Sequence, residues 1–254
     1  MKLIEKWYKE SEDQEKYFLK QNLYSCFASI DPENKEYPIL QEAFELLRNG
    51  KSLDFKGSPY FQVLPLVFIN HHRFYNAEII DFLKENVAEC SADKKALECC
   101  FCFFTVLFFT YSGSSIESSL EMLNDIFKDC VEEKIFDNAD FCNILMTSDL
   151  DTVKNIENVL EYILAAAICS IKTSMDRAAI INNFQKNTDA ILILADAIKG
   201  LLAVPDKIDF DSIDAKHRFI KKFYKFCIKD NSFSIMDFIK DLINKLKKKG
   251  LRKR

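Results

Sequence analysis

The chain has 254 residues, and 48% of them are hydrophobic, so it can bury a sizeable core. It contains 23 Phe but only 5 Gly and 5 Pro, a balance that favours long helices over the turn-rich strands of a β-sandwich. The formal net charge of −4 argues against a dedicated nucleic-acid-binding protein, which would usually be strongly basic.

The sequence shows no secretory signal in its first residues and no apolar run long enough to span a membrane. Met1–Lys20 is charged throughout and lacks an apolar stretch before a small-residue cleavage site. The strongest apolar run, CCFCFFTVLFFTY at Cys99–Tyr111, is well short of the ~20 residues that a membrane span needs. We therefore predict no transmembrane segment, and a buried core helix at Cys99–Tyr111.

Helical periodicity recurs along the chain, whereas no segment alternates apolar and polar residues as a strand would. Ser114, with Glu117 three residues later, fits a capping box for one of the predicted helices. The breaks between helices are short, so we predict one orthogonal multi-helix all-α domain over residues 1–254. Apolar stripes predict helices at 79–87, 116–130, 156–171, 220–227 and 235–246.

Nine cysteines are present, and Cys99 and Cys102 form a C-x-x-C pattern. A redox or metal pair would call for a β-α-β context or a second pair at zinc spacing, and neither follows. We interpret these cysteines as thiols packed in an apolar helix. Such a protein belongs in a reducing compartment, the cytosol of the producing cell or of a host.

Two further groups of polar residues have a functional and a plainer interpretation. Asp149 and Asp151 could ligate a metal or act as an acid–base pair, but a cap for a helix starting near Thr152 explains them better. His71 and His72 are adjacent and point to different sides, so we expect them on the surface of a loop before the helix near residue 76. No Ser-His-Asp or Cys-His set follows from the spacing of these residues and His217.

The basic tail Lys245–Arg254, KLKKKGLRKR, follows a predicted amphipathic helix. It could bind an anionic membrane surface, nucleic acid or an acidic partner. The plainer interpretation is a solvated helix end whose cations suit the C-terminal dipole, and we prefer it.

Ile163–Asp209 carries the most informative pattern: a small-residue helix, a short helix, the turn Asn187–Ala190, and a helix rich in Ala and Ile. It resembles the C-terminal signature of the ADP-ribosylglycohydrolases, the family that includes dinitrogenase reductase-activating glycohydrolases. In that family a Gly-Asp-Thr/Ser-Asp-Thr/Ser turn opens a helix patterned A-x-I-A-G-A-x-x-G. Three small positions of this helix are kept, at Ala195, Ala197 and Gly200, and Asp196 replaces a glycine.

A second match lies upstream and extends the resemblance over most of the chain. Gly57-Ser58 followed by Phe61–Leu66 is similar to the family's Gly-Asn-Gly-x-x-Met-Arg-x-x-Pro-Leu segment. A predicted turn at Cys90-Ser91 sits where the family usually carries Thr-His. Trp7-Tyr8 and Phe44–Gly50 resemble the segment before these motifs. The resemblance implies the orthogonal helical fold of the ADP-ribosylglycohydrolases, with their N-terminal part truncated.

The departures from this family concern its metal ligands. Its hydrolases hold two Mg²⁺ or Mn²⁺ ions with several carboxylates and hydroxyls. This sequence contains no Asp-Asp pair, and its C-terminal turn has Asn187 and Ala190 at two ligand positions. Asp189 is the one matching ligand position, with Thr188 as a further candidate. As the N-cap and the first-turn acid of a helix, Asn187 and Asp189 are explained without a metal.

Two larger residues, Gln185 and Lys186, replace the glycines that the family has before this turn. They place bulk and a cation beside the position that corresponds to the family's metal site. We therefore expect no catalytic residue and no metal cofactor. The ligand site is expected in a remnant cleft formed by Asn187, Thr188, Asp189, Gly57 and Ser58.

The leading hypothesis is a catalytically inactive relative of these hydrolases that acts by binding a protein partner, ADP-ribose or an ADP-ribosylated protein. Two alternatives stay open: an active hydrolase of ADP-ribose linkages with a rebuilt site, and a membrane-peripheral interaction protein that uses Lys245–Arg254.

Overall fold

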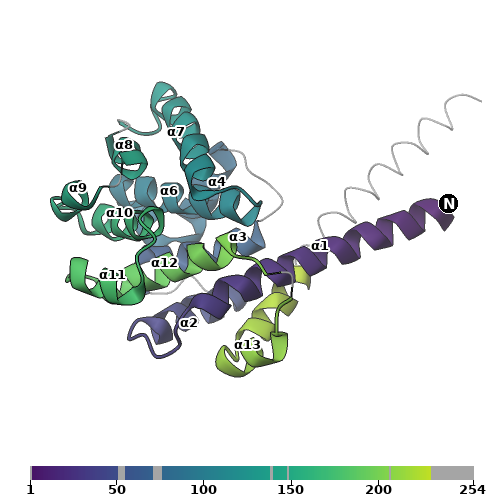
Figure 1. Ribbon diagram of the computed structural model, residues 1–254. Coiled ribbons are helices and arrows are strands. Elements are labelled where there is room, and N and C mark those ends of the chain that lie inside the picture. The colour runs from purple at the N-terminus through teal and green to yellow at the C-terminus, as the bar shows by residue number, and fades with distance from the viewer. Residues whose placement is uncertain are drawn as a thin grey trace, which may run out of the picture.

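The computed structural model describes residues 2–50, 55–70, 76–137, 140–147, 149–205 and 207–229, and all regular structure in these ranges is helical (Figure 1). The prediction of an all-α chain is confirmed for this part.

A further helical stretch begins at Ile220 and continues to residue 229. The predictions for His71, His72, the helix at 235–246 and the tail Lys245–Arg254 lie outside the described residues. The other helices are α1 (Lys2–Ser29), α2 (Tyr37–Arg48), α3 (Pro59–Ile69), α4 (Asn76–Asn86), α5 (Ala88–Ala92), α6 (Lys94–Tyr111), α7 (Ile116–Glu132), α8 (Asp140–Thr147), α9 (Leu150–Lys154), α10 (Val159–Lys172), α11 (Arg177–Asn183), α12 (Thr188–Leu202) and α13 (Phe210–Lys216).

Helix α6 is the centre of the fold, as its all-round apolar sequence predicts. Every residue from Ala96 to Leu107 is buried, and α3, α4, α5, α7, α10 and α12 all contact this helix. The helix starts at Lys94 because the carboxylate of Asp93 caps it, accepting a hydrogen bond from the Lys95 backbone N–H at 2.9 Å. None of the helices in the described part of the chain combines the length and the hydropathy needed to cross a bilayer.

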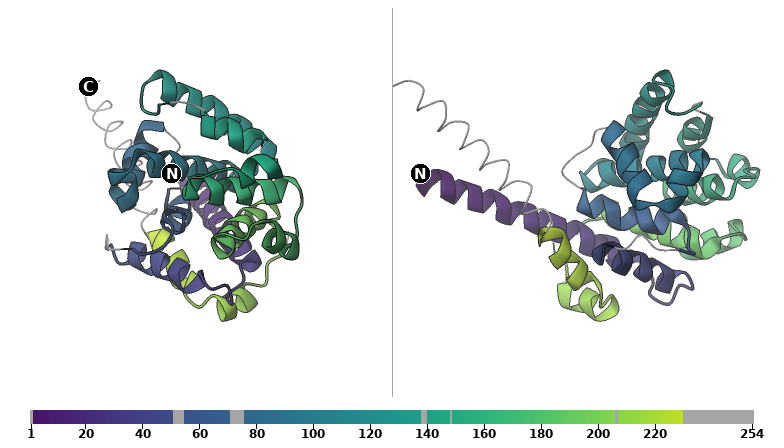
Figure 2. Two further views of the ribbon diagram at one scale, coloured as in Figure 1. Left: turned by 90° about the vertical axis from the view of Figure 1, so that its left-hand side faces the viewer. Right: turned by 180° about the vertical axis from the view of Figure 1, so that it is seen from behind.

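Helix α1 is long, and its N-terminal half extends beyond the helical body while its C-terminal half crosses α12 (Figures 1 and 2). The crossing is close because Gly200 of α12 has no side chain. A Cβ at this position would lie 2.5 Å from the Ser25 carbonyl oxygen and 2.7 Å from the Cys26 Cα. The Ser25 hydroxyl also donates a hydrogen bond to the Gly200 carbonyl at 2.6 Å. The small residue at this point of the pattern therefore has a packing role.

An ion-pair network joins α6 to α10. The Lys95 ammonium lies 2.9 Å from the carboxylates of both Glu98 and Glu161. Burial lowers the pKa of Lys95, but the two carboxylates outweigh it and raise the pKa well above its usual range. This lysine neutralises Glu98, whose side chain is buried in the helix interface.

Three local predictions need correction or refinement. The N-cap of α7 is Ser115, whose hydroxyl accepts from the Ser118 N–H, because the extended backbone of Ser115 puts the helix start at Ile116. The capping box at Ser114 was therefore wrong by one residue. Cys90-Ser91 lies inside α5 and is not a turn. Asp149 caps as predicted, accepting from the Thr152 N–H at 2.9 Å, but its helix already begins at Leu150.

All nine cysteines fall in the described ranges, and each is buried and free of a disulfide. Burial raises the pKa of Cys99 and of Cys102 well above the usual range of a thiol. Such thiols stay protonated and pack as small apolar groups, because the reactive and ligating form is the thiolate. The interpretation of the C-x-x-C pattern as packed thiols fits this environment.

Candidate functional site

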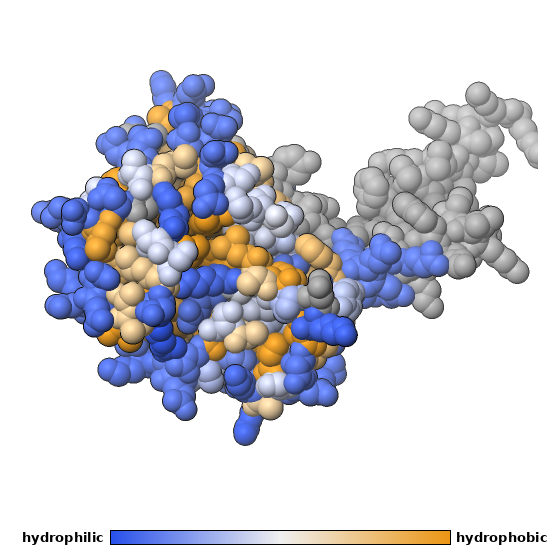
Figure 3. Space-filling model, in the orientation of Figure 1, coloured by the Kyte–Doolittle hydropathy of each residue, from blue (hydrophilic) through white to orange (hydrophobic). Residues whose placement is uncertain are grey.

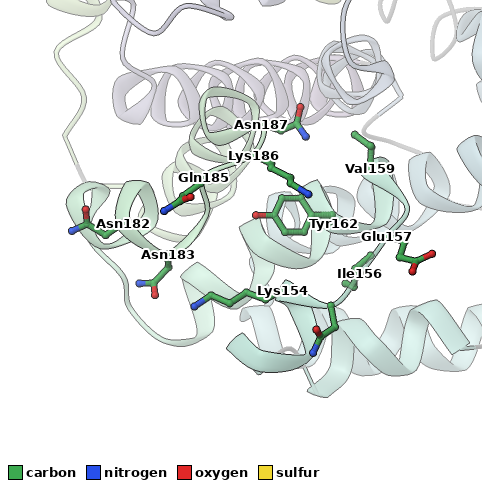
Figure 4. A pocket seen from close by; sticks show the side chains of 11 residues that line it. Lys154, Ile156, Glu157, Val159, Tyr162, Asn182, Asn183, Gln185, Lys186 and Asn187 are labelled. Carbon is green, nitrogen blue, oxygen red and sulfur yellow. The ribbon is translucent and has the colours of Figure 1, made fainter.

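A pocket of about 580 Å³ opens beside Asn187 (Figure 4). One wall is the connection from α9 to α10, and the other is the end of α11 with the turn into α12. Tyr162 of α10 lies between the two walls. The lining residues are Lys154, Asn155, Ile156, Glu157, Val159, Tyr162, Asn182, Asn183, Gln185, Lys186 and Asn187.

The charges of the pocket are positive on balance. Lys154 and Lys186 enter from opposite walls, on either side of Tyr162, whereas the carboxylate of Glu157 points away from the Tyr162 hydroxyl (Figure 4). Neither lysine forms an ion pair or a hydrogen bond with the described residues. A negatively charged ligand would therefore meet two cations that no carboxylate of the described chain already neutralises.

Amide side chains supply the rest of the polar lining. The amides of Asn155 and Asn183 donate to carbonyls of their own helices, each at 2.9 Å. Asn182, Gln185 and Asn187 make no side-chain hydrogen bond within the described chain. Each of these three amides can both donate and accept, so they offer contacts to neutral groups of a ligand.

Tyr162 is the most buried polar side chain of the pocket, with 9% of its surface exposed. Its ring packs edge-on against Phe184, with the ring centres 6.2 Å apart and the planes at 80°. Burial raises the pKa of Tyr162, and the nearby backbone N–H of Lys186 opposes this shift. The phenol therefore stays protonated at neutral pH and can donate a hydrogen bond into the pocket.

The turn that the sequence singles out has a different geometry from the one expected. Asn187 occupies the N-cap position of α12 but has a left-handed backbone, φ 53°, and its side chain caps nothing. The expectation of a side-chain cap was wrong, and Asn187 lines the pocket instead. The Thr188 hydroxyl donates to the Phe184 carbonyl, and the Asp189 carbonyl accepts from Asn34 at 3.0 Å. Asp189 lies in the first helical turn as expected, but it is not among the pocket-lining residues.

Gly57 and Ser58 do not line this pocket either. Gly57 packs under Ile39 and Phe55, and a Cβ there would lie 2.8 Å from the Phe55 ring. The Ser58 hydroxyl is buried and has no hydrogen-bond partner among the described residues. Of the five residues proposed for the remnant cleft, the structure places Asn187 at the pocket. The sequence also pointed to Gln185 and Lys186 beside the turn, and both line it.

The donors of the pocket do not fit a pair of hard divalent cations, which need several converging oxygen ligands. The lining residues include one carboxylate and two lysines. Elsewhere in the described ranges, no three His, Cys, Asp or Glu side chains come together in a group that could hold a metal ion. No catalytic step through Mg²⁺ or Mn²⁺ follows from these residues.

His217 lies far from the pocket residues in the sequence and is fully buried among aromatic rings. Its Nδ1 is hydrogen-bonded to the Tyr37 hydroxyl. Burial first, and the nearby Lys216 second, lower the pKa of His217 to about 4. Sequence reasoning could not find this pair, because its partners are 180 residues apart.

Asp196, which stands where the resemblance has a glycine, is a half-buried carboxyl on α12. Burial raises its pKa to about 6, and Arg177 and Lys199 oppose the shift. At pH values between the ordinary pKa of an aspartate and about 6, the folded state binds more protons at Asp196 than the unfolded state does. The free energy of unfolding therefore falls as the pH rises through this range. His217 has the opposite effect between about 4 and 6.5, because there the unfolded state binds more protons.

We expect Asp196→Asn to become more stable relative to the wild type as the pH rises from 4 to 6. The free energies of unfolding should diverge by roughly 1–3 kcal/mol over this range, since the variant no longer ionises a half-buried carboxyl. Urea denaturation at several pH values measures the difference, with Asp211→Asn, at an exposed position, as the control. A difference that stays constant with pH would contradict the assignment.

The pocket thus combines two cations, three amides free to bind and a buried phenol, and it lies at the turn that the sequence resemblance singled out. These features are typical of a binding site for an anionic ligand with polar substituents. Comparisons of this chain with protein-family models, with curated proteins and with solved structures found no match.

Proposed function

We propose that this protein acts by binding, and that the pocket beside Asn187 takes ADP-ribose or an ADP-ribosyl group on a partner protein. One observation carries the proposal. At the turn that resembles the ligand-binding turn of the ADP-ribosylglycohydrolases, the pocket presents two lysines without counter-charges, Lys154 and Lys186.

The ligand and the pocket match in size, charge and hydrogen bonding. A volume of about 580 Å³ lies within the range of small-molecule sites. The diphosphate of ADP-ribose carries two negative charges, which suit the two lysines. Ribose hydroxyls and the edge of the adenine both donate and accept hydrogen bonds, as do the amides of Asn182, Gln185 and Asn187.

The same residues favour binding over hydrolysis. Cleavage of a ribosyl linkage passes through a cation-like state at the anomeric carbon, which hydrolases stabilise with paired carboxylates or with metal ions that also activate water. Among the lining residues, Glu157 is the one carboxylate, and it points away from the middle of the pocket (Figure 4). We therefore assign no catalytic residue to this chain.

We expect the purified protein to release no ADP-ribose from modified arginine, serine or other acceptors, with or without added Mg²⁺ or Mn²⁺. The double change Asn187→Asp with Ala190→Thr should not create activity, because the N-terminal metal ligands of the family have no counterpart in the sequence. Release of ADP-ribose is measured by chromatography on a panel of ADP-ribosylated substrates. Turnover above background that Asp189→Ala abolishes would favour an active hydrolase with a rebuilt site.

Calorimetry with Mg²⁺ and Mn²⁺ should likewise show no tight binding, because two lysines and one carboxylate do not form a site for a hard cation. Adding ADP-ribose to the same samples controls for a folded, competent protein. Two sites of micromolar affinity or better would contradict the proposal.

The proposal places the protein in a reducing compartment, the cytosol of the producing cell or of a host. Nine buried thiols without a disulfide support this placement, because oxidising compartments favour disulfides in proteins with many cysteines. A role of Lys245–Arg254 at a membrane surface concerns residues outside the described part of the chain.

A further inference from the structure

Tyr162 has a constrained position between the two lysines of the pocket. Its ring is buried and packs edge-on against Phe184, and its hydroxyl points toward the middle of the pocket (Figure 4). The Tyr162 hydroxyl makes no hydrogen bond with the described residues. The ring is buried, but the hydroxyl oxygen keeps access to the pocket, so it can donate its proton to a ligand oxygen there.

We infer that Tyr162 makes the pocket selective for phosphate groups, by donating its hydroxyl proton to a phosphate oxygen that lies between Lys154 and Lys186. This inference rests on the proposed function, since it concerns the same pocket, and it names the part of the ligand that decides affinity. It assigns the amides of Asn182, Gln185 and Asn187 to the neutral remainder of the ligand.

The arrangement fits a phosphate better than a carboxylate because three donors from different elements line the pocket. The two lysines come from opposite walls, and the phenol lies between them (Figure 4). A phosphate presents three or four oxygens in a tetrahedral arrangement, so it can accept from all three donors at once. A carboxylate presents two oxygens in one plane, and a cationic ligand would meet repulsion from both lysines.

Free phosphate compounds and phosphate-bearing nucleotides share this chemistry, and three probes distinguish them. Calorimetry on the full chain uses inorganic pyrophosphate, ADP-ribose and adenosine. We expect ADP-ribose to bind at least ~10-fold more tightly than adenosine, and pyrophosphate to bind measurably, because hydrogen bonds to a charged group are stronger than those to a neutral one.

The deciding variant is Tyr162→Phe, which removes one hydroxyl and keeps the ring. We expect about a tenfold loss of affinity for pyrophosphate and ADP-ribose and no change for adenosine. Tyr60→Phe is the matched control, because this buried phenol donates to the Leu160 carbonyl at 2.7 Å and does not line the pocket. The control should lower the melting temperature and leave all three affinities unchanged.

A second pair of variants keeps the test independent of the tyrosine. Lys154→Met and Lys186→Met each remove a cation that makes no ion pair with the described chain, so both variants should fold normally. Each variant should bind pyrophosphate more weakly than the wild type. Its affinity should also fall less steeply as the salt concentration rises. Lys128→Met, an exposed lysine on α7, removes the same charge elsewhere and should have no effect.

The outcomes separate the two proposals. ADP-ribose binding that Tyr162→Phe and both lysine variants leave unchanged would overturn the phosphate inference and leave the proposed function standing. Pyrophosphate binding without ADP-ribose binding would overturn the proposed function alone. A wild-type protein that binds none of the three probes would overturn both.

Discussion

Replacing Phe104 with Ala should lower the free energy of unfolding by ~3–5 kcal/mol, which is the usual cost of truncating a fully buried aromatic side chain. Phe104 is 0% exposed and lies in the middle of α6, the helix that six others contact. The change removes the transfer free energy of the ring and leaves a cavity, and helices packed on every side cannot all move in to fill it.

Urea denaturation of the wild type and the variant measures this loss. Phe18→Ala is the matched control, because it makes the same chemical change at a ring that is 42% exposed. Phe18 keeps one edge-on ring contact, with Tyr111, so a loss of ~1 kcal/mol is expected there. A loss below ~1 kcal/mol at Phe104 would mean that α6 is not the centre of the core.

Replacing Gly200 with Val should destabilise the protein by more than ~2 kcal/mol, as overpacking of a tight contact does. The new Cβ would lie 2.5 Å from the Ser25 carbonyl oxygen and 2.7 Å from the Cys26 Cα. Both atoms belong to the backbone of α1, so relief requires a shift of the whole helix. Gly200→Ala tests the same contact with one methyl group, against a gain of up to ~1 kcal/mol in helix propensity.

Thermal and urea denaturation measure both substitutions at Gly200. Leu202→Ala, at an exposed position in the same last turn of α12, is the control and should change stability little. If Gly200→Ala proved as stable as the wild type, α1 and α12 would not approach as closely as described.

The part of the fold that could be predicted from the sequence is the part in which burial dictates the pattern. The run at Cys99–Tyr111 is apolar on all faces, and α6 is buried on all faces. The longest helix, α1, is absent from the helices that periodicity predicts, because its N-terminal half stands clear of the body and needs no apolar stripe (Figure 1). Predicted helix starts differ from the observed ones by up to three residues, as for α4, which starts at Asn76, and α10, which starts at Val159.

The pocket could be predicted only where it follows the chain locally. Gln185, Lys186 and Asn187 are consecutive, so one turn brings all three to the same wall. Lys154 and Tyr162 come from other elements, and no local pattern marks them as neighbours of that turn. Gly57 and Ser58 show the limit of arguing from order along the chain, because they pack beside Ile39 and Phe55 and not at the pocket.

The most direct test of binding without cleavage is an NMR titration of an ADP-ribosylated arginine peptide with the full chain and added Mg²⁺. We expect saturable changes of the adenine, ribose and diphosphate resonances, weakened in the Lys154→Met and Lys186→Met variants, while the ribosyl linkage stays intact through a long incubation. Spectra that do not change on addition of the protein, or resonances of free ADP-ribose that grow with time, would contradict it.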